Sequence, residues 1–263
     1  MTEYFINESS LPEAYHKALL TLYTAGDLVE CPDYNTTQKE ISITFCVAEP
    51  FSEPMISRLM IGGPEDLQQY CMEMVDGILD FEVSKGNWNY TYHNRMINYP
   101  VDNQIKFPNT ISINQLDFVV DELKRNPYSR RAVIDIRDNS KDTYSDDPAC
   151  LQHLQFFIRD NKLHLKVFFR SNDACKATFM NAFALIMLQK SIADRLGIEI
   201  GKYTHRANSF HCYEKDFPLL KGYVTRIIQN DDVTFEYEND WLPIMKEAES
   251  KINKKVKQLK DSV

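Results

Sequence analysis

Glycine, paired cysteine motifs and long apolar runs are all scarce in this chain of 263 residues. Its 8 glycines form no Gly-, Ser- or Pro-rich linker and no repeat is found, so we expect one domain over residues 1–263. The 6 cysteines are scattered, with neither a CxxC pair nor zinc-ligand spacing, so no metal site is expected. No apolar run approaches the roughly 20 residues of a membrane helix, so no membrane association is expected.

The chain also lacks a basic segment followed by an apolar stretch at its start. We therefore expect a cytoplasmic protein whose thiols stay reduced. A net charge of −8 argues against broad binding of nucleic acids or anionic membranes, although a local basic pocket could still bind a small phosphate. Because 43% of the residues are hydrophobic, the chain can bury a substantial core.

Hydrophobic periodicity predicts a mixture of helices and strands. We expect helices over residues 11–25, 64–76, 113–125 and 177–196, and strands over 41–47 and 131–136. Residues 153–159 and 163–169 are expected to form a β-hairpin around a polar turn. The last stretch, 239–263, alternates lysine and glutamate with sparse apolar positions, and we expect an exposed terminal helix or a frayed tail.

Cys150 has an unusual setting among the cysteines. It follows Pro148-Ala149, and the run Arg170-Ser171-Asn172-Asp173 begins 20 residues later. A thiol becomes a good nucleophile when a nearby cation stabilises its thiolate. Arg170 ends a predicted strand next to the one that follows Cys150, so its guanidinium could reach the sulfur. An isolated loop cysteine is more often a buried small hydrophobe. The arginine run favours a nucleophile beside an anion site instead.

Other polar residues follow in an ordered series. Asn181 lies on the predicted helix 177–196, while His211 and Tyr213 alternate along an extended segment and so share one face. Arg130 and Arg131 could bind phosphate, because a guanidinium fork contacts two oxygens at once. Each has an ordinary alternative: a capping or buried amide for Asn181, core packing for His211 and Tyr213, and a solvated turn for the arginines.

The order and spacing of these motifs, from Trp88 to Phe217, resemble the thymidylate synthase family, which includes the pyrimidine nucleotide hydroxymethylases. The segment from Tyr90 to Met96 resembles the archaeal-type synthases, with His93 where glycine is usual. The resemblance implies an α+β fold with a large twisted mixed sheet and packed helices, assembled as a homodimer. It implies transfer of a one-carbon unit from the co-substrate 5,10-methylenetetrahydrofolate to C5 of a pyrimidine nucleoside monophosphate.

The resemblance also implies a role for each candidate residue. Cys150 would add to C6 of the pyrimidine, Tyr92 would assist proton removal from C5, and Glu73, with Asp76 second, would be the general acid/base. The amide of Asn181 would match O4 and N3–H of uracil. Phosphate would be bound by Arg170 and Ser171 together with Arg130 and Arg131 of the neighbouring subunit, the sugar 3′-hydroxyl by His211 and Tyr213, and the folate pterin by Asp173. A structural cap is the alternative for Asp173.

The chain departs from the family pattern at several places. Its last residues, Lys257 to Val263, are not the short apolar tail of typical synthases, and Trp88 stands too close to Tyr92 to match their tryptophan. An early phosphate-binding arginine is also missing, with residues 35–39 as its candidate replacement. Asn172 occurs in hydroxymethylases too. Reductive methylation of dUMP to dTMP is the expected reaction. The alternative is a 5-hydroxymethylase acting on dUMP, or on dCMP or CMP, in which water replaces hydride.

Two hypotheses from other classes remain open at this point. A folate- or nucleotide-binding regulator, or a protein that binds its own messenger, would have no need for the Cys150 nucleophile. A Cys-His amidase would need His153, His205 or His211 beside Cys150, and it would leave the arginines and Asn181 without a role.

Overall fold

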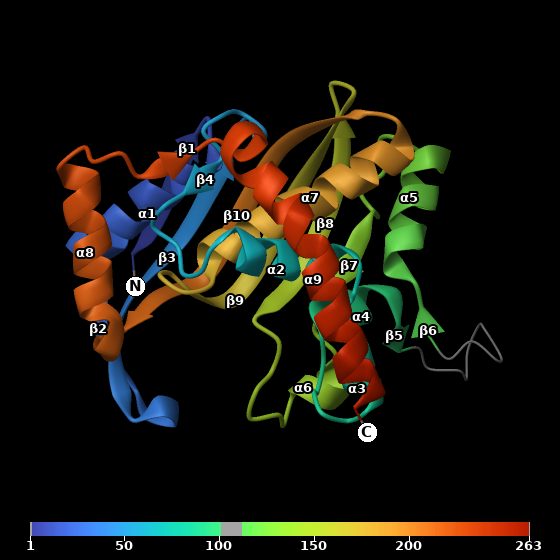
Figure 1. The fold of residues 1–263 in the computed structure, drawn as a ribbon, viewed down its shortest axis with the longest axis horizontal. Helices are drawn as coiled ribbons and strands as arrows, with labels where there is room; N and C mark the ends of the chain where they lie inside the picture. The colour runs from blue at the N-terminus through green and yellow to red at the C-terminus, as the bar shows by residue number, and fades with distance from the viewer. Residues whose placement is uncertain (1, 101–111, 263) are drawn as a thin grey trace.

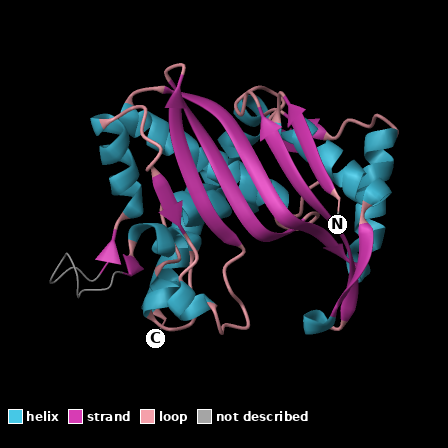
Figure 2. Ribbon diagram, turned by 180° about the vertical axis from the view of Figure 1, so that it is seen from behind, coloured by secondary structure: helices cyan, strands magenta, loops and turns pink. Residues whose placement is uncertain are grey.

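A twisted mixed sheet, covered by helices on one face, forms the framework of the computed structural model, which describes residues 2–100 and 112–262 (Figures 1 and 2). Strands β1 and β3 pair in parallel, as do β9 and β10, and the other pairs are antiparallel. The order across the sheet is β1 (Glu3–Glu8), β3 (Thr36–Val47), β10 (Glu199–Tyr213), β9 (Lys162–Asp173), β8 (Leu151–Arg159) and β7 (Val133–Asp135), with β2 (Asp27–Cys31) also pairing with β3. The α+β fold with a mixed sheet is therefore confirmed.

The helices are stacked in layers over that one face. Helices α1 (Leu11–Ala25) and α7 (Thr178–Leu196) pack on the sheet, α2 (Pro64–Val75) packs on α7, and α9 (Leu242–Asp261) packs on α2. Figure 1 shows α9 crossing in front of α2, with α8 and α5 at opposite sides. The remaining helices are α3 (Phe81–Ser84), α4 (Tyr92–Ile97), α5 (Gln115–Arg125), α6 (Asn139–Asp142) and α8 (Phe217–Ile228). Within the described residues, no helix is long and apolar enough to cross a membrane.

Short elements complete the described chain. Two-residue strands β4 (Ile56–Ser57) and β11 (Thr234–Phe235) pair with each other, as do β5 (Tyr99–Pro100) and β6 (Ser112–Ile113). Short 3₁₀ turns occupy Pro32–Tyr34 and Glu214–Asp216, and a π-helical turn at Tyr237–Trp241 leads into α9.

Most predicted elements form where the sequence places them. Helices 11–25, 64–76 and 177–196 are confirmed to within a residue or two, whereas α5 begins at Gln115 because the Asn114 side chain caps its first turn. The β8–β9 hairpin is also confirmed. Its turn residues Asp160 and Asn161 both have positive φ, +51° and +57°, as a tight turn between twisted strands requires. Strand β3 is longer than expected and β7 is shorter.

The expected exposed terminal helix forms as α9, not as a frayed tail, but one face of it is packed. Its few apolar residues Met245, Ile252 and Val256 recur at helical spacing and are buried. Ile252 and Val256 form a small apolar cluster with Met72 of α2 and Leu79. The helix thus supports α2 from outside, while its other faces remain largely exposed; Val263 lies outside the described residues.

Two neighbouring strands lose their regular alternation at the same level of the sheet. In β10, Tyr203, His205 and Ala207 are buried, but after a bulge between Ala207 and Phe210 three consecutive residues are buried, Phe210 and Cys212 in the core and His211 at the wall of a cavity. In β9 the buried series ends at Phe169 and resumes at Asn172. A one-residue shift sends the following side chains to the other face. As a result His211 and Tyr213, together with Arg170 and Ser171, are directed away from the packed core.

Candidate active site

A cavity of about 550 Å³ opens where β9 and β10 lose their alternation. It is lined by residues from β9, β10, the start of α7, the loop before β8, and the β2–β3 connection. Eight residues with predicted roles meet there: Cys150, Tyr92, Arg170, Ser171, Asp173, Asn181, and the pair His211 and Tyr213 from one strand. Residues far apart in sequence therefore form one site.

Arg170 is anchored on the loop that carries Cys150. Its Nε donates to the Ala149 carbonyl at 3.0 Å and its Nη2 donates to the Pro148 carbonyl at 2.6 Å. Burial raises the pKa of the Cys150 thiol, while Arg170 lowers it and Asp147 raises it further. The predicted closeness of guanidinium and sulfur is present, but burial has the larger effect, so the resting group is a protonated thiol.

Asn181 lies in the first turn of α7 and is 5% exposed. Its Oδ1 accepts a hydrogen bond from the Tyr70 hydroxyl of α2. Burial raises the pKa of Tyr70 far above its usual value, and Glu73 raises it further, so this hydroxyl keeps its proton. The amide of Asn181 faces the cavity with one of its lone pairs already occupied.

His211 and Tyr213 of β10 line the same cavity as Asn181. The His211 ring is 4% exposed and lies against Tyr213, with ring centroids 4.8 Å apart. The hydroxyls of Ser171 and Ser209 each lie 3.4 Å from His211 Nδ1. Burial lowers the pKa of His211, so the ring is neutral at pH 7 and presents one donor and one acceptor.

Asp173 caps the turn that leads into α7. Its Oδ1 accepts from the backbone N–H groups of Cys175 at 3.0 Å and Lys176 at 2.8 Å. The structural alternative for Asp173 is thus present in the fold. The same carboxylate also lines the cavity, which leaves a role in folate binding as a prediction.

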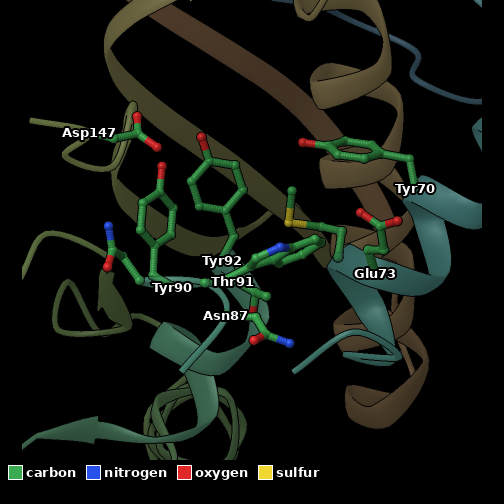
Figure 3. Close-up of a pocket in the computed structure, with 10 residues that line it drawn as sticks. Tyr70, Glu73, Asn87, Tyr90, Thr91, Tyr92 and Asp147 are labelled. Carbon is green, nitrogen blue, oxygen red and sulfur yellow. The ribbon is translucent and has the colours of Figure 1, made fainter. Parts of the chain in front are cut away.

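A second cavity of about 450 Å³ adjoins the first, because Tyr70, Tyr92 and Asp147 line both. Figure 3 shows Tyr70 and Glu73 projecting from α2 toward Tyr92, with Tyr90 and Asp147 on the opposite side. The other lining residues are Met74, Asn87, Trp88, Asn89 and Thr91. An indole and several phenol rings beside a carboxylate form a pocket suited to a flat, polar heterocycle.

Glu73 and Tyr92 are the titratable groups of this second cavity with predicted catalytic roles. Burial raises the pKa of Glu73, which accepts a hydrogen bond from Gln69 at 2.8 Å. Burial also raises the pKa of Tyr92 far above its usual value. Its hydroxyl accepts from the backbone N–H of Leu151 at 3.4 Å, beside Cys150. A carboxyl group with a raised pKa can exchange protons near neutral pH, whereas a neutral phenol can only donate or relay one.

Two candidate residues of this region stand at helix ends. Tyr92 is the first residue of α4, because the Thr91 side chain caps that helix by accepting from Asn94 N–H. Asp76, the second candidate for the acid/base, caps the end of α2 and lines neither cavity.

The structure does not bring Arg130 and Arg131 to the Cys150 cavity of their own chain. Both are exposed, and Arg131 Nε lies 3.2 Å from Glu122 Oε1. The segment 35–39 does not supply a cation either, because Lys39 donates to the Tyr23 carbonyl while Gln38 lines the cavity. Among the described residues that line this cavity, Arg170 is the single Lys or Arg.

None of the three histidines proposed for an amidase is hydrogen-bonded to Cys150 in the described structure. His153 pairs with Asp135 at 2.9 Å. His205 is stacked between Phe45 and Phe169 in the core, where burial lowers its pKa to about 3. His211 bonds to serines, as described above. This arrangement gives no support to a Cys-His pair.

Sequence reasoning missed several residues that line the cavities, including Tyr34, Tyr70, Tyr90 and Asp147. Tyr70 carried a usable signal, because it stands three residues before Glu73 and so shares its helix face. Tyr34, by contrast, lies in a connection, and its edge contact with Tyr213, at 5.5 Å between ring centroids, has no sequence signature.

The chain is similar to proteins of one known family. Residues 64–246 match the family described as Thymidylate synthase. A Methanocaldococcus jannaschii protein named "Putative thymidylate synthase" is 33% identical over 227 residues, covering 83% of this chain and 95% of that protein. A thymidylate synthase of Bacillus subtilis subsp. natto is 32% identical over 131 residues, which are 49% of this chain and 44% of that protein. In structure, thermostable thymidylate synthase A from Bacillus subtilis aligns with a TM-score of 0.66 at 18% identity, covering 87% of this chain and 86% of that one. The chain belongs to the thymidylate synthase family.

Proposed function

We propose that the protein converts dUMP to dTMP, with 5,10-methylenetetrahydrofolate as the donor of the one-carbon unit and of hydride. The observation that carries this proposal is the meeting of a thiol, a guanidinium, an amide and a histidine in one cavity that adjoins an aromatic cavity. Volumes of about 550 and 450 Å³ fall within the range of small-molecule sites.

The first cavity would hold the nucleotide. Arg170 and Ser171 would bind the phosphate, and neutral His211 with Tyr213 would bind the 3′-hydroxyl of the sugar. Asn181 would donate from Nδ2 to O4 of uracil and accept N3–H at Oδ1. These contacts would place C6 of the ring beside Cys150.

In the reaction, Cys150 Sγ would bond to C6 and lose its proton as it does so. The negative charge would move through C5 to O4, where the Asn181 amide stabilises it. Tyr92, held by the Leu151 N–H, would orient the water or group that removes the C5 proton. Glu73 would accept that proton, because burial gives its carboxyl a raised pKa.

The second cavity fits the co-substrate. Trp88 and Tyr90 offer aromatic faces, and Asn87 and Asn89 offer donors and acceptors to a pterin. Asp173 would accept a pterin hydrogen bond with the carboxylate oxygen that does not cap the turn. When bound, the folate supplies the one-carbon unit and, in methylation, the hydride.

A 5-hydroxymethylase is the second candidate, and the position of α9 favours it. In the described chain, no residue of α9 lines either cavity. Lys85 instead donates to the Leu259 carbonyl at 2.9 Å and the Lys260 carbonyl at 3.0 Å, and so holds this end of α9 beside α3. A site that stays open to water would favour attack by water over hydride transfer.

We further propose a homodimer in which Arg130 and Arg131 reach the partner's phosphate site. One cation is few for a dianionic phosphate. In Figure 2 the strands face the viewer with no helix over them. Half-buried Phe157 and Phe168 each stand next to a buried phenylalanine on β8 and β9, so they point to this uncovered face. Gln155, on the same face, donates to the Arg130 carbonyl, which places Arg130 at its edge. A second copy docked there would bury the phenylalanines and receive the arginines.

The test is mass spectrometry of the product formed from dUMP and methylenetetrahydrofolate, with dCMP and CMP run in parallel. A methylated product with dihydrofolate supports the synthase. A hydroxymethylated product with tetrahydrofolate returned establishes the second candidate. A third assay looks for a covalent adduct with a 5-fluorinated dUMP and folate, with Cys150→Ala as the negative control. If the wild type forms no adduct, the protein binds its ligands without catalysing the reaction.

A further inference from the structure

Tyr70 stands at the junction of the two cavities and touches the residue that reads the base. It projects from the second turn of α2, its hydroxyl donates to Asn181 Oδ1, and it lines both cavities (Figure 3). Helices α2 and α7 pack against each other, so both ends of this hydrogen bond are fixed by the core.

The amide of Asn181 can face the ring in two ways. With Oδ1 toward N3 and Nδ2 toward position 4 it matches uracil, which presents N3–H and O4. Rotated by 180°, it matches cytosine, which presents an acceptor at N3 and an amino group at position 4. An asparagine alone therefore does not decide between the two bases.

Tyr70 makes the two orientations unequal. In the uracil orientation its hydroxyl donates to one lone pair of Oδ1 and leaves the other lone pair for N3–H. In the rotated orientation the hydroxyl faces the Nδ2 hydrogens, and its own proton loses its acceptor. Among the described hydrogen bonds, Asn181 is the single partner of this hydroxyl. An unpaired buried donor disfavours the rotated state.

We propose that Tyr70 is a positioning residue that fixes the orientation of the Asn181 amide and thereby selects uracil over cytosine. This inference rests on the proposed function for the identity of the ligand as a pyrimidine nucleotide. It assigns the choice of base to a pair of residues on two helices, Tyr70 and Asn181, rather than to Asn181 alone.

The experiment compares dUMP with dCMP in the wild type and in Tyr70→Phe, which keeps the ring and removes the hydroxyl. The ratio of kcat/KM for dUMP over dCMP should fall by about tenfold or more, with most of the loss in KM for dUMP. Tyr203→Phe is the matched control, because it removes a buried hydroxyl, bonded to His205 at 2.8 Å, that lines neither cavity. This control should leave the ratio unchanged.

The same substitution in an Asn181→Asp protein distinguishes an effect on the orientation of the amide from an effect on packing. The two oxygens of a carboxylate are equivalent, so Tyr70→Phe in an Asn181→Asp protein should change both substrates by the same factor. If Tyr70→Phe lowers both substrates equally in the asparagine protein as well, or if the wild type prefers dCMP, the proposal is overturned.

Binding separates this inference from the proposed reaction. In Cys150→Ala, calorimetry measures the Kd values of dUMP and dCMP without turnover, and the further change Tyr70→Phe should lower the ratio of the Kd for dCMP to the Kd for dUMP by a similar factor. A shift in that ratio with no turnover in the wild type would keep the inference and reject the reaction. An unchanged ratio would reject the inference even if the wild type makes dTMP.

Discussion

The two adjoining cavities are formed by different kinds of secondary structure. The Cys150 cavity is framed by strands β9 and β10 and by the first turn of α7, and Arg170 is tied to two carbonyls of its loop. The Glu73 cavity is framed by one face of α2 and by residues 87–92, which follow a glycine with φ +75°. The first is fixed by the sheet, and the second depends on how a helix and a connection lie against each other.

The two cavities have different requirements under the proposed function. The Cys150 cavity must hold its reacting groups rigidly, whereas the Glu73 cavity must admit a second substrate. A nucleophile and its base-reading amide need positions fixed within a fraction of an ångström. Arg170 of β9 ties down the loop that carries Cys150, and the packing of α7 fixes Asn181. A pocket beside a connection can adapt its width to a larger partner. Substitutions in the first cavity should therefore act on the chemical step, and those in the second should act on proton transfer and on folate binding.

The largest effect is expected for Cys150→Ala. Loss of the nucleophile should lower kcat by about 10⁴-fold or more, because no other group can bond to C6. Cys31→Ala is the matched control, since Cys31 also lines the cavity as a half-buried thiol. It should change kcat/KM by about twofold or less. Product formation and thermal unfolding are measured together. Turnover retained by a folded Cys150→Ala protein would contradict the assignment.

The sheet cavity was the easier one to predict from the sequence. The family resemblance named Arg170, Ser171, His211 and Tyr213 as parts of one site, and the parallel pairing of β9 with β10 brings them to one level of the sheet. The bulge that turns His211 away from the core was not predicted, since nothing in its neighbouring residues marks a one-residue shift. The residues line one cavity, as the resemblance implies, but the backbone feature that directs them there was not predicted.

The helix-and-loop cavity was predicted less well. Glu73 was named because the resemblance implies a carboxylate on an upstream helix. Trp88 was set aside because it stands near Tyr92 in sequence, and the structure shows Trp88 and Tyr92 lining one cavity. The start of α4 at Tyr92 depends on a cap by Thr91, a local signal that a strand-like aromatic pattern concealed. The packing of α9 on α2 was also missed, because the three apolar residues that it buries are a weak signal in a helix with so many charged residues.

Glu73→Gln should have the next largest effect, a loss of about 10³-fold in kcat. The raised pKa of Glu73 gives the sign of the pH dependence. If the ionised carboxylate is the base, the rate rises with pH as Glu73 loses its proton, so the acid limb lies above the usual glutamate range. That limb should be absent from the pH–rate profile of Glu73→Gln. Asp76→Asn, whose group lines neither cavity, should keep it. A variant Glu73→Gln with an unchanged acid limb would assign the limb to another group.

A smaller effect is expected for Arg130→Ala combined with Arg131→Ala. Removing two phosphate contacts should raise KM for the nucleotide by about 10- to 100-fold. At substrate concentrations below that KM, mixing this protein with Cys150→Ala tests the dimer, because a mixed dimer contains one site with both the thiol and the arginines. Full exchange should restore about a quarter of the wild-type sites. If mixing restores nothing although the subunits exchange, the arginines do not act on the partner's site.

The smallest effect on activity is expected from the outer layer, in Ile252→Ala. Ile252 is 1% exposed in the cluster that joins α9 to α2, so its truncation should lower the free energy of unfolding by about 2 kcal/mol. Ile244→Ala, at a position 51% exposed on the same helix, should lower it by less than about 0.5 kcal/mol. Thermal or denaturant unfolding gives both values, and kcat/KM is measured beside them. If α9 only supports α2 from outside, kcat/KM should change by less than about threefold. If a fully folded Ile252→Ala protein loses much of its activity, α9 instead sets the position of Tyr70 and Glu73. The geometry of the second cavity would then depend on the packing of the outermost helix as well as on α2.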